Sequence, residues 1–113
     1  MPPDDLTRLR HMRDAAQEAL TFVRGKTSED LARDRMLALA VVRCIEIIGE
    51  AAAKVGPQTR AAAPAIPWTA MVGMRNRLVH GYFEIDYDRV WDTVEKDLPG
   101  LLENLAGLLG PAS

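Results

Sequence analysis

The sequence is poor in the residue types that hold metals and act as nucleophiles. Among 113 residues there is one cysteine, Cys44, and there are two histidines, His11 and His80. This excludes an intrachain disulfide and a cysteine-rich zinc site, and no Glu-x-x-His pair indicates a di-iron centre. The serines, Ser28 and Ser113, stand in no nucleophile motif, and no glycine-rich phosphate loop is present. We therefore expect no metal and no cofactor.

Long apolar runs are also missing. No charge-free stretch reaches the roughly 18 residues of a membrane span, and residues 1–5 lack the positive flank and apolar centre of a signal peptide. We therefore expect a cytoplasmic protein without a membrane segment. The formal net charge is −2, so binding to nucleic acid requires a local positive patch.

Aromatic residues make up only 5% of the chain and hydrophobic residues 48%, with alanine and leucine frequent. This composition favours helices packed on helices. The length is that of a single domain, residues 1–113. Cys44 lies in an apolar run, so we expect a buried, unreactive thiol.

The hydrophobic periodicity predicts four main helices. They cover residues 4–23, 27–55, 67–80 and 86–109. A short helical turn at residues 59–63 is an optional addition, and Pro99 should kink the last helix. The predicted fold is all-α: an antiparallel, up-and-down helical bundle of four main helices with room for one short extra helical turn.

The second predicted helix is apolar on almost every side over residues 36–53. A small domain covers one face of such a helix, so the rest needs a partner, and we predict that it contributes to a homodimer interface. Arg43, Glu46 and Glu50 interrupt this surface at three- and four-residue spacing. They form either an ion-pair ladder or solvated edge, or the border of a cleft.

One cluster offers chemistry that needs no metal. Arg75, Asn76, Arg77, His80 and Tyr82 follow one another closely at the predicted end of the third helix. Histidine moves protons near neutral pH, and the forked donors of arginine match phosphate oxygens. Together these groups suit attack of an RNA 2′-hydroxyl on the neighbouring phosphate, with the arginine stabilising the charge on phosphorus.

A regular helix does not bring all of these groups together. At 100° per residue Asn76 and His80 share a face, whereas Arg75 and His80 are roughly 140° apart. They converge only if the helix distorts before Gly81, if the arginine reaches around the helix, or if a second subunit completes the site. Without convergence the cluster is a surface patch.

The same segments resemble a known family. The stretches IPW (66–68) and GMRNRLVHGY (73–82) contain the pattern R-x4-H-x-Y with asparagine directly after the arginine. They closely resemble the HepT-like branch of the HEPN superfamily, as do IIGEAA (47–52) and residues 86–91. The resemblance extends over residues 8–102.

This resemblance implies a fold and a function. HEPN proteins are helical bundles that usually dimerise and bring two motifs to a shared cleft, and many are metal-independent endoribonucleases. HepT-like members commonly act as toxins in two-gene modules. Their antitoxin is a minimal nucleotidyltransferase (MNT) that transfers AMP to the motif tyrosine. By resemblance Arg75 and His80 are catalytic, Asn76 supports them, and Tyr82 accepts AMP.

Two further expectations complete the sequence-based hypothesis. Arg77 and Arg43 are additional candidates for contact with RNA, because arginine binds phosphate. The alternative to a ribonuclease toxin is a non-catalytic nucleotide- or protein-binding subunit that docks the nucleotidyltransferase. Such a subunit would leave RNA intact while still binding its partner.

Overall fold

The computed structural model of the protein describes residues 1–81 and 84–110. The helices are α1 (Pro3–Val23), α2 (Ser28–Arg33), α3 (Arg35–Ala53), α4 (Pro57–Ala62), α5 (Trp68–Leu78), α6 (Tyr87–Asp92) and α7 (Leu98–Leu109). A π-helical segment, η1 (Thr93–Asp97), joins α6 to α7, and the strands β1 (Val79–His80) and β2 (Glu84–Ile85) form a small antiparallel sheet.

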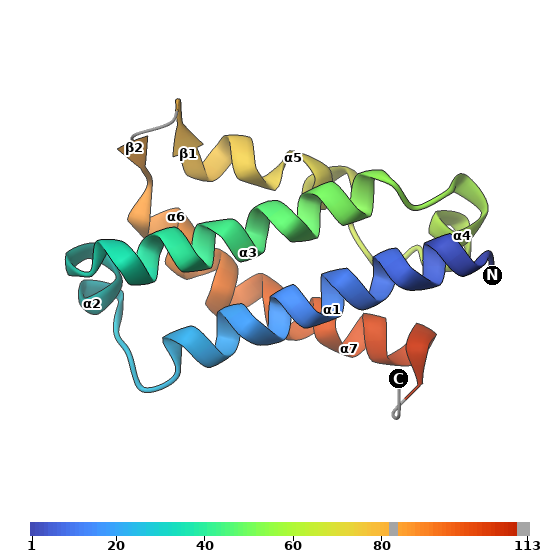
Figure 1. The fold of residues 1–113 in the computed structure, drawn as a ribbon, viewed down its shortest axis with the longest axis horizontal. Coiled ribbons are helices and arrows are strands. Elements are labelled where there is room, and N and C mark those ends of the chain that lie inside the picture. The colour runs from blue at the N-terminus through green and yellow to red at the C-terminus, as the bar shows by residue number, and fades with distance from the viewer. Residues whose placement is uncertain (82–83, 111–113) are drawn as a thin grey trace.

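The long helices run up and down (Figure 1). α1 and α3 lie antiparallel, α5 packs against the other side of α3, and α7 runs back along α1. The molecule measures 19 Å along its shortest axis, about the thickness of two packed helices. The predicted all-α antiparallel bundle is confirmed. None of the described helices is both long and apolar enough to cross a membrane.

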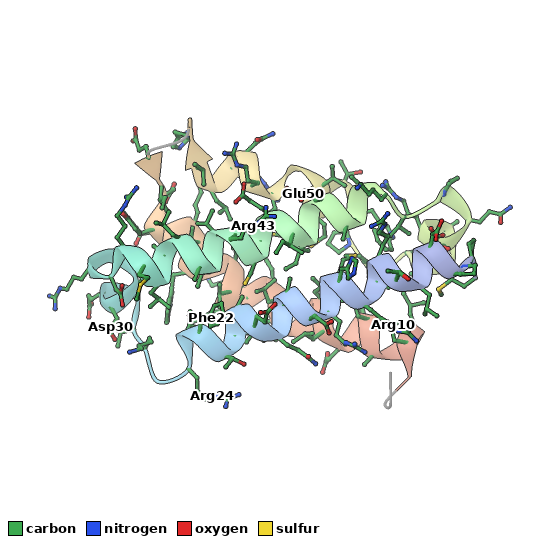
Figure 2. The ribbon with its side chains drawn as sticks, viewed as in Figure 1. Arg10, Phe22, Arg24, Asp30, Arg43 and Glu50 are labelled. Carbon is green, nitrogen blue, oxygen red and sulfur yellow. The ribbon has the colours of Figure 1, made fainter. Side chains whose placement is uncertain are left out.

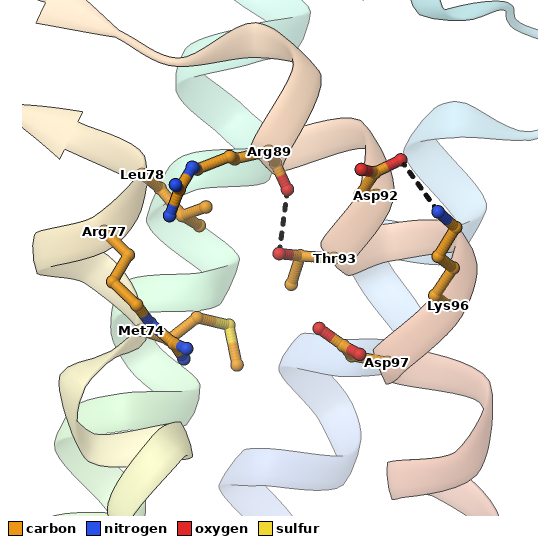
Figure 3. A pocket seen from close by; sticks show the side chains of 8 residues that line it. All are labelled: Met74, Arg77, Leu78, Arg89, Asp92, Thr93, Lys96 and Asp97. Carbon is orange, nitrogen blue, oxygen red and sulfur yellow. Dashed lines mark hydrogen bonds and ion pairs between the residues drawn. The ribbon is translucent and has the colours of Figure 1, made fainter.

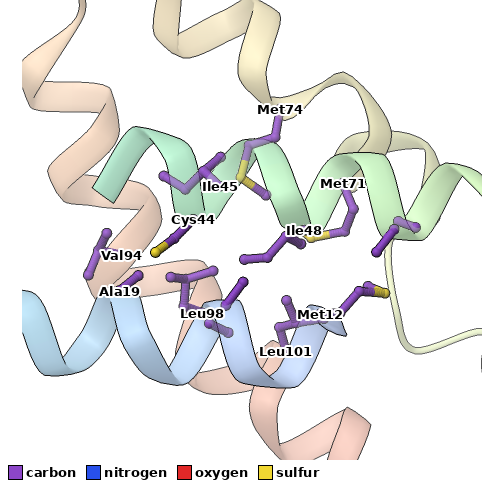
Figure 4. Close-up of a cluster of buried hydrophobic side chains, with 14 of the residues drawn as sticks. Met12, Ala19, Cys44, Ile45, Ile48, Met71, Met74, Val94, Leu98 and Leu101 are labelled. Carbon is purple, nitrogen blue, oxygen red and sulfur yellow. The ribbon is translucent and has the colours of Figure 1, made fainter. Parts of the chain in front are cut away.

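Apolar side chains from the long helices meet in one core (Figure 4). Met12, Ile45, Ile48 and Leu98 are fully buried there. Cys44 lies in the same core, and desolvation raises the pKa of its thiol to about 11. The thiolate is the reactive form of cysteine, and it is scarce near neutral pH at such a pKa. The prediction of a buried thiol is confirmed.

The single helix predicted over residues 27–55 is wrong, because α2 and α3 are separate helices. Between them Asp34 is extended, and its side chain accepts a hydrogen bond from the backbone N–H of Leu37 at 3.1 Å. This is an N-cap interaction, which starts a new helix. The hydrophobic periodicity continues on both sides of Asp34 and therefore does not reveal the break.

The helix predicted over residues 86–109 begins as expected, and its interruption lies just before Pro99. The Asp86 side chain accepts a hydrogen bond from the backbone N–H of Arg89 and so caps α6. The irregularity lies in η1 and not at Pro99, which occupies the first turn of α7. Proline is tolerated there because the first N–H groups of a helix have no intrahelical acceptor. The interruption therefore lies within the turn before Pro99, which includes Glu95, the residue whose carbonyl group a proline at position 99 deprives of its hydrogen bond.

The third predicted helix is shorter than its pattern indicated. Pro67 is the N-cap of α5 and not its first residue, and α5 ends at Leu78, before Gly81. The chain then becomes extended, and His80 pairs with Glu84 across the small sheet. Gly81 adopts a φ of +69°, which a residue without a Cβ reaches at little cost. The optional turn at residues 59–63 is present as α4.

The start of α1 is tied to α4 through Asp5. This buried carboxylate accepts hydrogen bonds from the Thr59 hydroxyl at 2.6 Å and from the Gly56 N–H at 3.1 Å. The hydrogen bond from Thr59 makes the larger contribution and that from Gly56 the smaller one, and together they hold the pKa of Asp5 below its ordinary value. The negative charge of Asp5 is therefore part of the folded structure.

The end of α3 is held by Arg60. Its guanidinium donates to the carbonyl oxygens of Ala52 at 2.9 Å and Val55 at 3.0 Å, and it lies 5.8 Å from the ring centroid of Trp68. A cation at a helix C-terminus satisfies carbonyl groups that lack an intrahelical donor. Arg60 thereby joins the ends of α3 and α4 to the start of α5.

Candidate functional site

A close approach of two helices positions the arginine of the motif. Gly49 of α3 faces the backbone of α5. A Cβ atom at Gly49 would lie 3.0 Å from the carbonyl oxygen of Met71 and 3.4 Å from that of Val72. The absence of a side chain lets the two helices pack this closely. Glu46, one turn earlier on α3, then comes within reach of Arg75 on α5.

Arg75 is held by an ion pair and remains accessible. Its Nε lies 3.3 Å from Glu46 Oε2, and the two side chains are 43% and 26% exposed, respectively. The Nε atom itself is buried, and its geometry toward Glu46 does not make a hydrogen bond. The contact is therefore an ion pair without a hydrogen bond. It orients the Arg75 guanidinium, which remains accessible to solvent.

Arg75 borders a groove of about 250 Å³ between α3 and α5. The groove is lined by Glu46, Gly49, Glu50, Ala53, Val72, Arg75 and Asn76. The structure thus brings two of the predicted catalytic residues, Arg75 and Asn76, into one depression. They share it with two carboxylates of the α3 stripe.

The charged stripe of Arg43, Glu46 and Glu50 on α3 agrees with both interpretations offered for it: an ion pair and the border of a cleft. Arg43 and Glu50 form an exposed ion pair, with Arg43 Nη1 3.4 Å from Glu50 Oε1 (Figure 2). Glu46 and Glu50 also border the groove that contains Arg75. Arg43 itself is not among the groove-lining residues, and its charge is partly satisfied by Glu50.

His80 lies outside this groove. It is exposed on β1, opposite Glu84, and is not among the residues that line the depression. The helical angle between Arg75 and His80 does not apply, because α5 ends at Leu78. The helix does end before Gly81, as the first of the routes considered above requires, but His80 does not share the groove with Arg75. Tyr82 lies outside the described residues.

Arg77 faces the opposite side of α5 from Arg75. Its Nη2 donates to the Ala70 carbonyl oxygen at 2.9 Å, and the side chain lines a different depression, between α5 and the α6–η1–α7 segment (Figure 3). Residues two apart on a helix point in nearly opposite directions. The RNA-binding role predicted for Arg77 therefore concerns another surface than the Arg75 groove.

Within residues 1–81 and 84–110, no three His, Cys, Asp or Glu side chains gather closely enough to hold a metal ion. The groove instead offers a guanidinium, an amide and two carboxylates. A guanidinium and an amide can bind the oxygens of a phosphodiester and stabilise added negative charge.

Comparison with known proteins identifies the family. The family profile described as "Ribonuclease HepT-like" matches residues 12–107. The chain belongs to the HepT-like ribonuclease family. The matched range contains the motif at residues 75–82, the Arg75 groove and the depression around Arg77. The resemblance noted from the R-x4-H-x-Y pattern is therefore confirmed.

Relatives of this HepT-like protein are known from several organisms. One is "Probable ribonuclease HepT" of Thermococcus cleftensis, 37% identical over 93 residues, which are 82% of this chain and 84% of that protein. A second, from Caldanaerobacter subterraneus and provisionally named an RNase, is 34% identical over 101 residues, 89% of this chain and 90% of the relative. No solved structure shows a significant match.

Sequence reasoning did not pair Glu46 with Arg75 or explain Gly49. A glycine inside an otherwise apolar helix is a signal of close backbone approach, and this signal was present in the sequence. The glycine alone, however, does not indicate which helix packs against it. The contact joins residues 29 positions apart, so only the packing of α3 on α5 reveals it.

Proposed function

We propose that this HepT-like protein is a metal-independent endoribonuclease that cleaves RNA through its R-x4-H-x-Y motif. We propose further that it is the toxin of a two-gene toxin–antitoxin module. The observation that carries the proposal is the open groove in which Arg75 and Asn76 lie together, in a chain of a ribonuclease family. His80 follows on the adjoining strand, exposed and able to meet a substrate.

In the proposed reaction the 2′-oxygen of a ribose attacks the adjacent phosphorus. The new P–O2′ bond forms and the P–O5′ bond breaks, which leaves a 2′,3′-cyclic phosphate and a 5′-hydroxyl. His80 accepts the proton of the 2′-hydroxyl or delivers one to the leaving oxygen. Arg75, oriented by Glu46, stabilises the extra charge on the phosphoryl oxygens, and Asn76 supports the same group.

A homodimer is part of the proposal. Met36 and Leu39 of α3 are 80% and 47% exposed, and Val72 of α5, which lines the groove, is 40% exposed. We take the face that α3 and α5 present together as the dimer interface, because exposed large apolar side chains are typical of such surfaces. Pairing of two chains through this face would cover them and bring two motifs to a common cleft. Sedimentation of the purified protein should then give the mass of two chains, and a monomer at micromolar concentration would count against this part.

Regulation by an MNT-type nucleotidyltransferase is proposed for Tyr82. Its phenolic oxygen would attack the α-phosphorus of ATP, forming a phosphodiester to AMP and releasing pyrophosphate. An anionic adenylyl group two residues from His80 would obstruct the site and repel RNA. Intact-mass analysis of protein co-expressed with an MNT-type nucleotidyltransferase tests this. A mass increase that survives Tyr82→Phe would contradict it.

The decisive experiment incubates purified protein with total RNA in EDTA and maps the ends. We expect cyclic phosphates, and a loss of at least about a hundredfold in rate for His80→Ala and for Arg75→Ala, the usual contribution of acid–base catalysis and of a charged transition-state donor. His11→Ala and Arg24→Ala remove the same groups elsewhere and should keep full activity. Cleavage by His80→Ala at the wild-type rate would reject the catalytic assignment.

One observation favours the alternative of a non-catalytic subunit that docks the nucleotidyltransferase. Arg75 already has a carboxylate partner in Glu46, so part of its charge is satisfied without a phosphate. Under this alternative the pure protein leaves RNA intact in every buffer and still forms a stable complex with the transferase. The same RNA assay, run beside a pull-down, separates the two functions.

A further inference from the structure

A second groove lies on the far side of α5 from Arg75. Two adjoining depressions of about 380 and 340 Å³ share Arg77, Lys96 and Asp97, so they form one elongated channel between α5 and the segment from α6 to α7. We call it the η1 groove, because η1 forms part of its wall (Figure 3). Met74 and Leu78 contribute an apolar lining at one end.

The η1 groove gathers three cations in a protein of net charge −2. Three cations, Arg77, Arg89 and Lys96, line it against two carboxylates, Asp92 and Asp97. The Arg89 and Lys96 side chains are 63% and 72% exposed. Arg89 pairs at 3.4 Å with Asp86, which lies next to the lining but is not part of it, and Lys96 pairs at 3.5 Å with Asp92. Exposed pairs of this kind contribute little energy, so both cations can exchange their partner for a phosphate.

The backbone of η1 gives a second reason to regard this groove as functional. π-helical turns are rare, occur mostly as single turns within α-helices, and recur at functional sites. Here the π-helical segment contains Lys96 and Asp97, and in Figure 3 the Asp97 carboxylate and the Arg77 guanidinium face one another across the groove. The Thr93 hydroxyl, in the same segment, donates to the Arg89 carbonyl oxygen at 2.8 Å.

We propose that the η1 groove is a second RNA-binding surface, which holds the phosphodiester backbone of the substrate beyond the cleavage site. This inference rests on the proposed ribonuclease function. Arg75 and Arg77 are two residues apart on one helix about 10 Å wide, so a single strand bound at the Arg75 groove can continue around the end of α5. Open, elongated grooves that carry positive charge are the surfaces on which single strands bind.

The charges also assign roles within the groove. Phosphates contact Arg77, Arg89 and Lys96, whereas a carboxylate repels them. Asp97 therefore faces a base, whose exocyclic amino group donates hydrogen bonds to carboxylates. In this arrangement the η1 groove positions the strand and contributes to affinity, whereas the Arg75 groove performs the chemistry.

The test measures fluorescence anisotropy of a labelled single-stranded RNA with full-length protein carrying His80→Ala, so that no cleavage occurs. In this background Lys96→Gln and Arg89→Gln should each weaken binding roughly tenfold, as expected for the loss of a charge-assisted contact, and reduce the salt slope by about 1. Arg24→Gln removes the same charge from the loop after α1 and should bind as the parent does.

Two results would overturn the inference. One is equal affinity of the Lys96→Gln, Arg89→Gln and Arg24→Gln proteins while RNA is still bound. The other is displacement of the RNA by AMP alone at comparable concentration, which would indicate a mononucleotide pocket. Cleavage by the wild-type protein, measured separately, tests the ribonuclease proposal. An active enzyme with unchanged KM in Lys96→Gln would refute only the η1 groove, whereas inactivity toward every RNA would refute the ribonuclease proposal.

Discussion

Gly49→Ala probes the contact between α3 and α5 on which the Arg75 groove depends. The added Cβ would meet the Met71 carbonyl oxygen at 3.0 Å and the Val72 carbonyl oxygen at 3.4 Å. Both are backbone atoms, so no flexible side chain can rotate away. α5 must instead move by a few tenths of an ångström relative to α3, and the Arg75–Glu46 contact should change with it.

Two opposing terms set the size of the effect. Alanine in place of glycine inside a helix stabilises by up to about 1 kcal/mol. Overpacking of a tight contact costs about 1–3 kcal/mol. The net change for Gly49→Ala is therefore between about 0 and 2 kcal/mol of destabilisation. Gly73→Ala is the matched control, because Gly73 lies in α5 with nothing within 4 Å of its added Cβ, and only the helix-propensity gain remains.

Urea unfolding at one fixed protein concentration measures this difference. The two variants should differ by about 1–3 kcal/mol, which is roughly 4 °C or more in Tm for a domain near 100 residues. The RNA cleavage rate should fall in Gly49→Ala more than in Gly73→Ala, since only the former displaces Arg75 from Glu46. If Gly49→Ala is as stabilising as Gly73→Ala, the close approach does not limit the packing and the reasoning is refuted.

Two further predictions concern the ends of the helices. The pKa of Asp5 is depressed below 3.8, so its charged form stabilises the fold above that value, and this contribution is lost as the pH falls through the folded pKa. The Tm difference between wild type and Asp5→Asn should therefore be constant from roughly pH 5 to 7, where the carboxyl group is ionised in both the folded and the unfolded protein. It should shrink below pH 3.8. A difference that grows in acid would contradict this. Arg60→Met removes two hydrogen bonds to carbonyl groups near the end of α3 and the cation–π contact with Trp68. It should cost about 1–3 kcal/mol in urea unfolding, and no loss would show that water replaces the guanidinium.

The sequence alone was sufficient for the parts of the protein that depend on local chemistry. Apolar periodicity indicated the long helices and hence the antiparallel bundle, because a helix needs one face against a core. The Asp86 cap and the buried Cys44 followed from neighbouring residues. The R-x4-H-x-Y motif indicated the family for the same reason, since it lies in one short segment.

Tertiary structure decided which side chains share a surface. The hydrophobic pattern passes through Asp34 and through η1 unchanged, so neither break was visible in it. The end of α5 at Leu78 removed His80 from the helix and made its angle to Arg75 meaningless. The Glu46–Arg75 pair depends on the distance between two helices, which Gly49 permits but does not specify. Contacts between residues far apart in the chain depend on how whole elements pack, and a pattern along one element contains no information about its neighbour.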